Sequence, residues 1–378
     1  MGRRFLPHLP RIPSSKDASG RSGKWKRSKD TGNSLFGATV EPDLESKTMI
    51  MFEVKRRVIL LSLCTDHTCK ECIADFEYIA LKIRDYPDSV TQKLMENGFL
   101  EIFQHALEWL FKNPVTEAAC RAFISACRIV INMTDVSSTA CRKVIQLELH
   151  SDIINSLKSG HLDPRLKKNQ KLSPSLCELA EKLIAVLYNL MQMTPETSEL
   201  YQKQGINEVI QRFRTGTSNS LSCFALMFLA WMISDKSSFN LNANDEDFRF
   251  LNQQLRSSLD TDTHRSDYGY KSVEILSAIN MLVANDANKE RFVKSGVLSS
   301  YVAFLEPHFD TEEQFLATQG LWSIAFKCAE EIKKEKFCVE SGLLFNVMIS
   351  SIVAHSPHGY SEIVGLWSGV GLGKTNPV

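Results

Sequence analysis

The feature that most constrains this chain of 378 residues is internal repetition. The tetrapeptide GLWS occupies residues 320–323 and recurs at 365–368, 45 residues later. Four further segments place a glycine between a short helical pattern and an apolar helical pattern, at Gly98, Gly205, Gly296 and Gly342. Glycine in this position is typical of a helix end. Self-similarity at such a period predicts stacked helical units, each burying its core against its neighbours.

The repeated units share one register. A long helical pattern ends about 16 residues before each hinge, and Glu148 and Asp247 take the hinge position where glycine is missing. We name the six positions 16 residues before a hinge the groove ladder; they are spaced by 50, 57, 42, 49 and 46 residues. They are Lys82, Asn132, Asn189, Trp231, Asn280 and Phe326. The uneven steps predict polar insertions at residues 162–173 and 260–270, with a divergent fourth repeat near Trp231.

A long helix with alternating Ala and Leu, a short helix ending at glycine and a following apolar helix together resemble the armadillo repeat. The resemblance covers about residues 55–370. It implies an all-α fold, a right-handed superhelical solenoid of armadillo-like repeats whose long helices line a concave groove. We therefore expect a repeat domain at residues 44–370, with about six repeats and a seventh cut off after Trp367. Residues 371–378 are expected to form a flexible end.

The N-terminal segment, residues 1–43, has the composition of a disordered basic tail. Its first 29 residues contain nine Lys and Arg but only one acid, Asp17, while the whole chain has a formal net charge of zero. The helical body is therefore acidic, which argues against nucleic-acid binding by the solenoid. The basic segment at residues 24–29 is compatible with a nuclear localisation signal, the acid-poor start with a mitochondrial presequence, and the whole tail with a merely solvating role.

Location is predicted from the cysteines and from the apolar runs. The chain has ten cysteines and no apolar segment near its N-terminus that resembles a signal peptide, so we expect reduced thiols in the cytoplasm or the nucleus. The longest apolar run near the N-terminus, residues 58–64, is too short to cross a bilayer. No membrane association is expected, and the oligomeric state is left open.

Cys64, His67, Cys69 and Cys72 offer four potential zinc ligands within nine residues. Zinc ligands usually come from two separated pairs, and four ligands this close would compete with a helix starting at Cys69. A redox pair of Cys69 and Cys72 lacks the usual βαβ context. We interpret these cysteines as small apolar residues at a helix junction. The remaining seven are interpreted as core or near-core thiols: Cys120, Cys127, Cys141, Cys177, Cys223, Cys328 and Cys338.

No pattern in the chain points to catalysis. The segment GLGKT at residues 371–375 resembles a phosphate-binding loop, but Ser368 replaces its first glycine and no helix can follow before the chain ends. The nine histidines are scattered outside any recognisable catalytic motif. We expect no enzyme activity, no cofactor and no metal site.

The groove ladder is the strongest functional candidate, together with Trp322, four residues before Phe326. Asparagine amides can bind the backbone of an extended peptide, and aromatic rings can either receive its side chains or pack between repeats. These considerations predict a protein–protein interaction scaffold or adaptor that binds a protein or extended peptide in signalling. Two alternatives stay open: the regulatory region of a larger signalling enzyme, and a nuclear transport adaptor. The second lacks the intact Trp–Asn pairs that import adaptors carry along this face.

Overall fold

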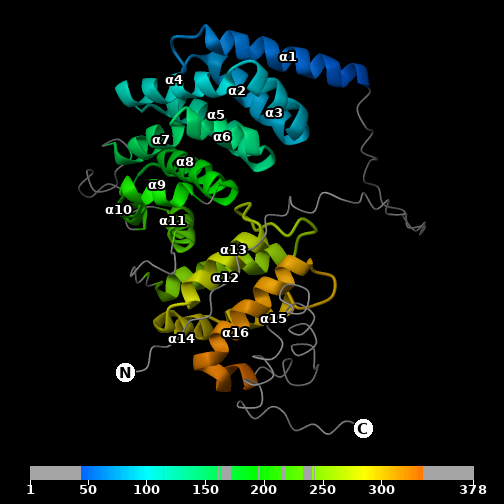
Figure 1. Ribbon diagram of the computed structural model, residues 1–378, viewed down its shortest axis with the longest axis vertical. Coiled ribbons are helices and arrows are strands. Elements are labelled where there is room, and N and C mark those ends of the chain that lie inside the picture. Colours follow the sequence, from blue (N-terminus) through cyan, green and yellow to red (C-terminus); the bar gives the residue numbers. More distant parts are fainter. Residues whose placement is uncertain are drawn as a thin grey trace.

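The computed structural model describes residues 44–113, 115–159, 162, 172–194, 196–214, 218–232, 241 and 243–334. Within these ranges the chain forms sixteen α-helices that stack from α1 at one end to α16 at the other (Figure 1). The predicted all-α solenoid is therefore confirmed. The basic tail 1–43, most of the insertion 162–173, the hinge Gly342, the seventh repeat at Trp367 and the end 371–378 lie outside the described residues.

The helices follow the predicted order of a long helix, a short helix and a third helix. After α1 (Leu44–Ser62), two further helices complete the group that α2 begins. The bounds are α2 (Lys70–Asp85), α3 (Pro87–Glu96), α4 (Phe99–Lys112); α5 (Glu117–Val136), α6 (Ser138–Gln146), α7 (Leu149–Lys158); α8 (Pro174–Met193), α9 (Thr197–Lys203), α10 (Ile206–Phe213); α11 (Asn219–Trp231), α12 (Asp245–Leu259); α13 (Ser272–Val283), α14 (Asp286–Lys294), α15 (Val297–Ala303); and α16 (Thr311–Lys334). Among these helices none is long and apolar enough to span a bilayer.

The predicted hinges adopt a left-handed backbone conformation directly before the third helix of a repeat. Gly98, Gly205 and Gly296 have φ of 71°, 69° and 76°, and each is the N-cap of the helix that follows. Glu148 takes this role before α7 with φ of 55°, as the register predicted. Left-handed backbone is easily adopted by glycine and costs energy for other residues, which explains the glycine at three of the four hinges.

The hinge expected at Asp247 is wrong. Asp247 is the third residue of α12, and its carboxylate accepts a hydrogen bond from the Asn244 backbone N–H at 2.8 Å. The Asn244 side chain in turn accepts from the Asp247 N–H at 2.9 Å. These reciprocal bonds form a capping box, so a helix start stands where a left-handed hinge was expected.

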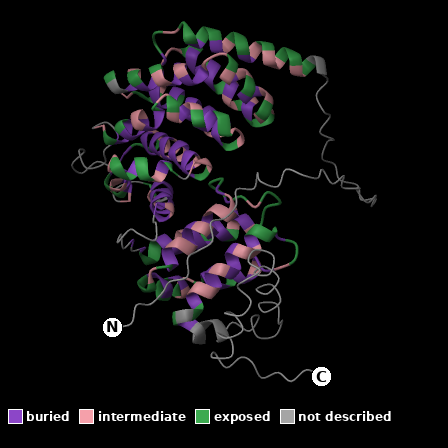
Figure 2. Ribbon diagram, viewed as in Figure 1, coloured by how far each residue is buried: buried purple, intermediate pink, exposed green. Residues whose placement is uncertain are grey.

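The core of the solenoid lies between neighbouring long helices. α2, α5, α8, α11, α13 and α16 contact one another in that order and form what we call the long-helix row. The third helices form a second layer, in which α4 contacts α7, α7 contacts α10 and α12 contacts α15. In Figure 2 the buried residues concentrate along these stacked helices, and the central helices α5, α8 and α11 are buried over most of their length. No repeat encloses a core alone, which is the property that defines a solenoid.

α1 closes one end of the array. Val54, Val58 and Leu61 bury one face of this helix against the rest of the chain. The opposite face exposes apolar side chains at helical spacing, namely Met49, Phe52, Ile59, Leu60 and Leu63. The position of α1 therefore depends on a single buried face and on the junction to α2.

Candidate interaction groove

All six residues of the groove ladder lie on the long-helix row. Lys82 is in α2, Asn132 in α5, Asn189 in α8, Trp231 in α11, Asn280 in α13 and Phe326 in α16. Their common spacing of about 16 residues before a hinge therefore corresponds to one place on equivalent helices. The side chain of Phe326 lies outside the described residues, and Trp322 on the same helix is half-buried.

Two ladder asparagines bridge neighbouring repeats. The Asn189 Nδ2 donates to the Ile131 carbonyl at 2.9 Å and to Thr134 Oγ1 at 3.3 Å, which joins α8 to α5. The Asn280 Nδ2 donates to the Leu316 carbonyl of α16 at 2.8 Å, and its Oδ1 accepts from the Tyr301 hydroxyl at 2.9 Å. A peptide that used these two amides would have to compete with contacts between helices.

The other described ladder residues have more local contacts. Asn132 Nδ2 donates to the Arg128 carbonyl of its own helix at 2.7 Å. Lys82 Nζ lies 3.9 Å from the Asp85 carboxylate and 5.8 Å from the centre of the Tyr78 ring. Trp231 stacks on Tyr188 of α8 with ring centres 4.0 Å apart. Trp231 thus packs between repeats, one of the two roles expected for the aromatic residues, while the Asn132 amide is held only within its own helix.

A hollow of about 190 Å³ lies against the middle of the long-helix row, and it contains both Asn132 and Asn189. We name it the central hollow. Helices α5, α8, α11 and α13 contribute to its wall, and residues 265–271 complete it. Its lining comprises Ile131, Asn132, Asp135, Glu181, Lys182, Ala185, Tyr188, Asn189, Phe224, Arg265, Tyr268, Gly269, Tyr270, Lys271 and Glu274.

The predicted insertion at 260–270 folds onto the row. Gly269 has φ of 84°, and an isolated antiparallel bridge pairs Arg265 with Lys271. The ring of Tyr270 stacks on Phe224 of α11 with centres 5.5 Å apart. The turn within the insertion therefore carries aromatic side chains back across the helices of the preceding repeats.

A buried carboxylate fixes the base of the same insertion. Glu313 of α16 is 1% exposed and lies 2.8 Å from His264 Nδ1. The Ser272 hydroxyl and the Asp310 N–H also donate to this carboxylate. A group that is buried and accepts several hydrogen bonds holds its partners in one geometry, so the insertion is part of the folded array.

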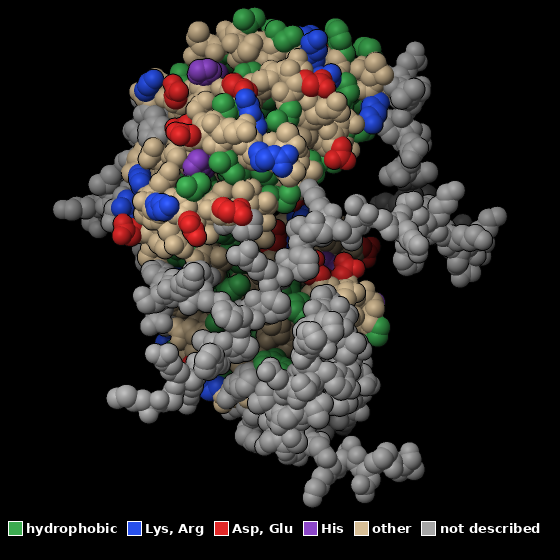
Figure 3. All heavy atoms as spheres, in the orientation of Figure 1, with side chains coloured by type: hydrophobic (Ala, Val, Ile, Leu, Met, Phe, Trp, Pro, Cys, Tyr) green, Lys and Arg blue, Asp and Glu red, His purple; other side chains and the backbone are tan. Residues whose placement is uncertain are grey.

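Charges of both signs surround the central hollow. The Glu181 carboxylate accepts from the Ser220 hydroxyl at 2.9 Å and pairs with Lys182 at 3.2 Å. Burial raises the pKa of the Glu274 carboxyl, although its carboxylate accepts the Lys271 N–H at 2.8 Å. Figure 3 shows the same mixture on one outer face, where Lys, Arg, Asp and Glu alternate over the upper helices. A surface of mixed charge is suited to a polypeptide with charges of both signs.

Two tyrosines give the hollow an aromatic floor with polar tips. Burial raises the pKa of both Tyr188 and Tyr270. Their hydroxyls therefore stay protonated near neutral pH. An aromatic surface that also carries hydrogen-bonding groups is characteristic of protein interfaces.

The sequence reasoning missed the aromatic and charged residues that complete the hollow. The register pointed only to Asn132 and Asn189, whereas Tyr268 and Tyr270 belong to a segment interpreted as a polar loop. Two tyrosines flanking a glycine within an insertion are a usable signal, because such a turn can direct both rings to one side. Their partners on α5, α8 and α11 could not be read from the register.

The structure also locates the predicted cysteines. Cys120, Cys127, Cys141, Cys177, Cys223 and Cys328 are buried, as expected for core thiols. Cys338 lies outside the described residues. The junction between α1 and α2 brings the sulfurs of Cys64, Cys69 and Cys72 together, and the group does not include His67.

Comparison with known proteins gives structural likeness alone. No family model matches the sequence, and no curated protein matches it. An engineered protein in the solved structures is 17% identical, with a TM-score of 0.41 over 72% of this chain and 97% of that one. A designed armadillo repeat protein solved in complex with the peptide (KR)4 is 16% identical, with a TM-score of 0.40 over 72% and 99%. Another designed armadillo repeat protein is 14% identical, with a TM-score of 0.29 over 80% and 99%.

Proposed function

We propose that this chain is a non-enzymatic interaction scaffold that binds a partner protein or an extended peptide along the long-helix row, in signalling. The central hollow carries the proposal. It places the locally bonded amide of Asn132 beside the aromatic rings of Tyr188 and Tyr268 and beside charges of both signs. An extended polypeptide offers matching groups, since its backbone binds amides and its side chains pack on rings.

The position of the hollow also supports a polypeptide ligand. It lies at the middle of the row, where α5, α8 and α11 are adjacent, so that a ligand can run along several repeats. Its wall combines Tyr268, a half-exposed ring, with backbone and side chains from helices that are themselves packed on both sides. Rigid helices that present side chains at the regular spacing of a repeat are well suited to recognise a chain rather than a small compact molecule.

The test is a screen of the full chain against an array of extended peptides that includes basic sequences, followed by affinity measurements on the peptides that bind. We expect Asn132→Ala and Tyr268→Ala each to weaken binding about tenfold, equivalent to about 1.4 kcal/mol, the scale of one lost hydrogen bond or ring contact. Arg142→Ala is the matched control, because Arg142 is exposed on α6 and not on the long-helix row. Its affinity should equal that of the wild type.

Binding that survives both substitutions, or that Arg142→Ala weakens equally, would contradict the proposed site. Preferential binding of the basic peptides would instead favour the transport-adaptor alternative. Circular dichroism of each variant distinguishes a lost contact from a lost fold.

A further inference from the structure

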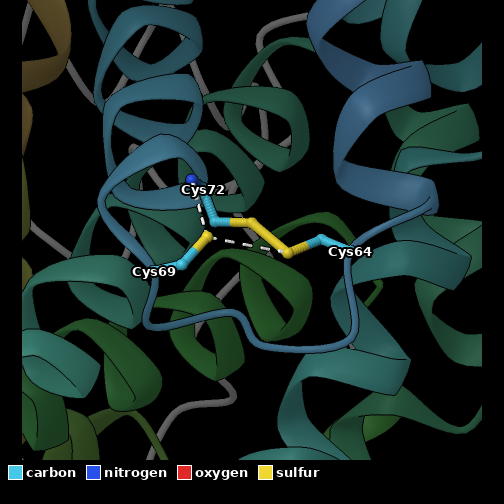
Figure 4. A group of neighbouring side chains, drawn as sticks. All are labelled: Cys64, Cys69 and Cys72. Carbon is cyan, nitrogen blue, oxygen red and sulfur yellow. Dashed lines mark hydrogen bonds between the residues drawn. A yellow bond between two sulfur atoms is a disulfide. The ribbon is translucent and has the colours of Figure 1, made fainter.

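Three cysteine sulfurs meet where α1 ends and α2 begins (Figure 4). The Sγ atoms of Cys64, Cys69 and Cys72 all lie within 4.8 Å of one another. Cys64 and Cys72 are joined by a disulfide, and the Cys69 Sγ lies 3.8 Å from the Cys64 Sγ. The Cys69 thiol remains free beside this bond. A plain structural disulfide accounts for two of these sulfurs and leaves the third unexplained.

The local backbone places the three sulfurs together without disturbing the helix. Cys69 is the N-cap of α2, and its Sγ accepts the Cys72 N–H at 3.4 Å. The preceding turn is closed by Asp66, whose carboxylate accepts the Thr68 N–H at 2.9 Å and the Thr68 hydroxyl at 2.7 Å. A shared site was expected to compete with a helix starting at Cys69. That objection does not hold, because α2 begins at Lys70 and Cys69 and Cys72 lie on one side of its first turn.

The spacing fits a tetrahedral metal centre. Zinc–thiolate bonds of about 2.3 Å at tetrahedral angles put two sulfurs about 3.8 Å apart. The Cys64–Cys69 separation has this value. The Cys72 N–H that points at Cys69 becomes a charge-assisted hydrogen bond once that sulfur is a thiolate. Three thiolates form a soft ligand set, which selects zinc over magnesium or calcium.

We propose that the reduced Cys64, Cys69 and Cys72 bind one Zn²⁺, which ties the end of α1 to the start of α2. The fourth coordination position goes to water. His67 belongs to the same segment, is 5% exposed and has a buried Nδ1 without a hydrogen-bond partner, but its nitrogens lie outside the group of three sulfurs. The metal therefore depends on the three cysteines.

The site exists in two chemical forms. A dithiol reductant supplies two electrons and two protons to the Cys64–Cys72 bond, gives two thiols, and is itself oxidised to a disulfide. Zn²⁺ then binds as the thiols lose their protons to solvent. In either form a covalent or coordinate link holds α1, whose buried face is otherwise its main attachment. The third sulfur distinguishes the two forms, because the disulfide does not need Cys69 and the metal does.

The experiment uses the full chain after reduction and removal of the reductant under anaerobic conditions. Co²⁺, a spectroscopic substitute for Zn²⁺, is titrated while the sulfur-to-cobalt charge-transfer absorption is recorded, and Zn²⁺ is then added to displace it. We expect about one Co²⁺ per chain, displaced by Zn²⁺, and a rise in the thermal midpoint when Zn²⁺ binds. Cys69→Ser and Cys64→Ser should each weaken binding by more than about 100-fold, since even partners of metal ligands contribute 10- to 100-fold.

Cys177→Ser is the matched control, because Cys177 is a buried free thiol of α8 remote from the junction. It should bind metal as the wild type does. The proposal is overturned if the reduced wild type gives no charge-transfer band, a result that requires no variant to fold. It is equally overturned if Cys69→Ser, folded by circular dichroism, binds Co²⁺ with unchanged affinity.

Discussion

The Lys271 ammonium lies 3.6 Å from the Asp135 carboxylate, a contact that joins the end of the 260–270 insertion to α5. Both side chains are substantially exposed, so this ion pair alone stabilises the fold little. Its interest is geometric. The insertion reaches past α8 and α11 to a helix formed by a much earlier part of the chain, and the central hollow exists because it does so.

Removal of Glu313 should release this insertion. Glu313→Ala leaves the Ser272 hydroxyl and the Asp310 N–H without their acceptor, and a hydrogen bond to a buried charged group contributes about 1.5–3 kcal/mol. We expect faster amide hydrogen exchange across residues 260–271 and a lower free energy of unfolding. Glu312→Ala, at the exposed neighbouring position, is the control and should leave both unchanged. Equal exchange in the two variants would show that Glu313 does not anchor the insertion.

The two ladder asparagines Asn280 and Asn132 should differ in their effect on stability. Asn280→Ala removes the bond to the Leu316 carbonyl and one partner of the Tyr301 hydroxyl, so it should cost about 1–3 kcal/mol in urea denaturation. Asn132→Ala removes only a bond within its own helix and should change the free energy of unfolding by less than about 0.5 kcal/mol. If the two variants proved equally stable, the role of Asn280 between repeats would be refuted.

Gly320 should resist replacement by alanine. A Cβ at this position would overlap the Tyr301 ring and the Asn280 amide oxygen, although alanine normally favours a helix. We expect Gly320→Ala to cost about 1–3 kcal/mol through overpacking. Ala325→Gly, at an exposed position of α16, should cost about 1 kcal/mol through helix propensity alone. Stabilisation by Gly320→Ala would mean that α13, α15 and α16 do not pack as described.

The acid limb of stability should depend on Glu53. A hydrogen bond from Arg56, assisted by Arg57, lowers the pKa of Glu53 from 4.5 to about 2. Because the folded pKa is the lower one, the stabilisation is complete above pH 4.5 and is lost as the pH falls towards about 2. The folded wild type should show the low carboxyl pKa in an NMR titration. Glu53→Gln and Arg56→Gln should each remove this contribution to the pH dependence, and an ordinary carboxyl titration in the wild type would contradict it.

The register of the repeats could be predicted from sequence because it depends on local chemistry. A left-handed residue before each third helix requires glycine or a tolerated substitute, which is why Gly98, Gly205, Gly296 and even Glu148 were found. The same counting failed at Asp247, where the pair Asn244 and Asp247 is itself a capping signature that counting disregards.

The candidate site could be predicted only in part. Asn132 and Asn189 follow from the register, but the central hollow depends on the docking of residues 265–271 against helices distant in sequence. The carbonyl partners of Asn189 and Asn280 likewise depend on how far one long helix is shifted along the next. The cysteine site was dismissed because ligand spacing was judged along the chain, whereas the turn at Asp66 and the helix start at Lys70 bring the sulfurs together in space.

Glu148 has a mechanical consequence for the array. It holds a left-handed conformation that costs a side-chain-bearing residue about 1–2 kcal/mol, and glycine avoids that cost at the three other described hinges. In a linear array each unit contacts only its neighbours, so this penalty is not shared along the whole length. Under an axial load the joint between α6 and α7 is therefore expected to yield first, and Glu148→Gly would make the elastic response of the array more even.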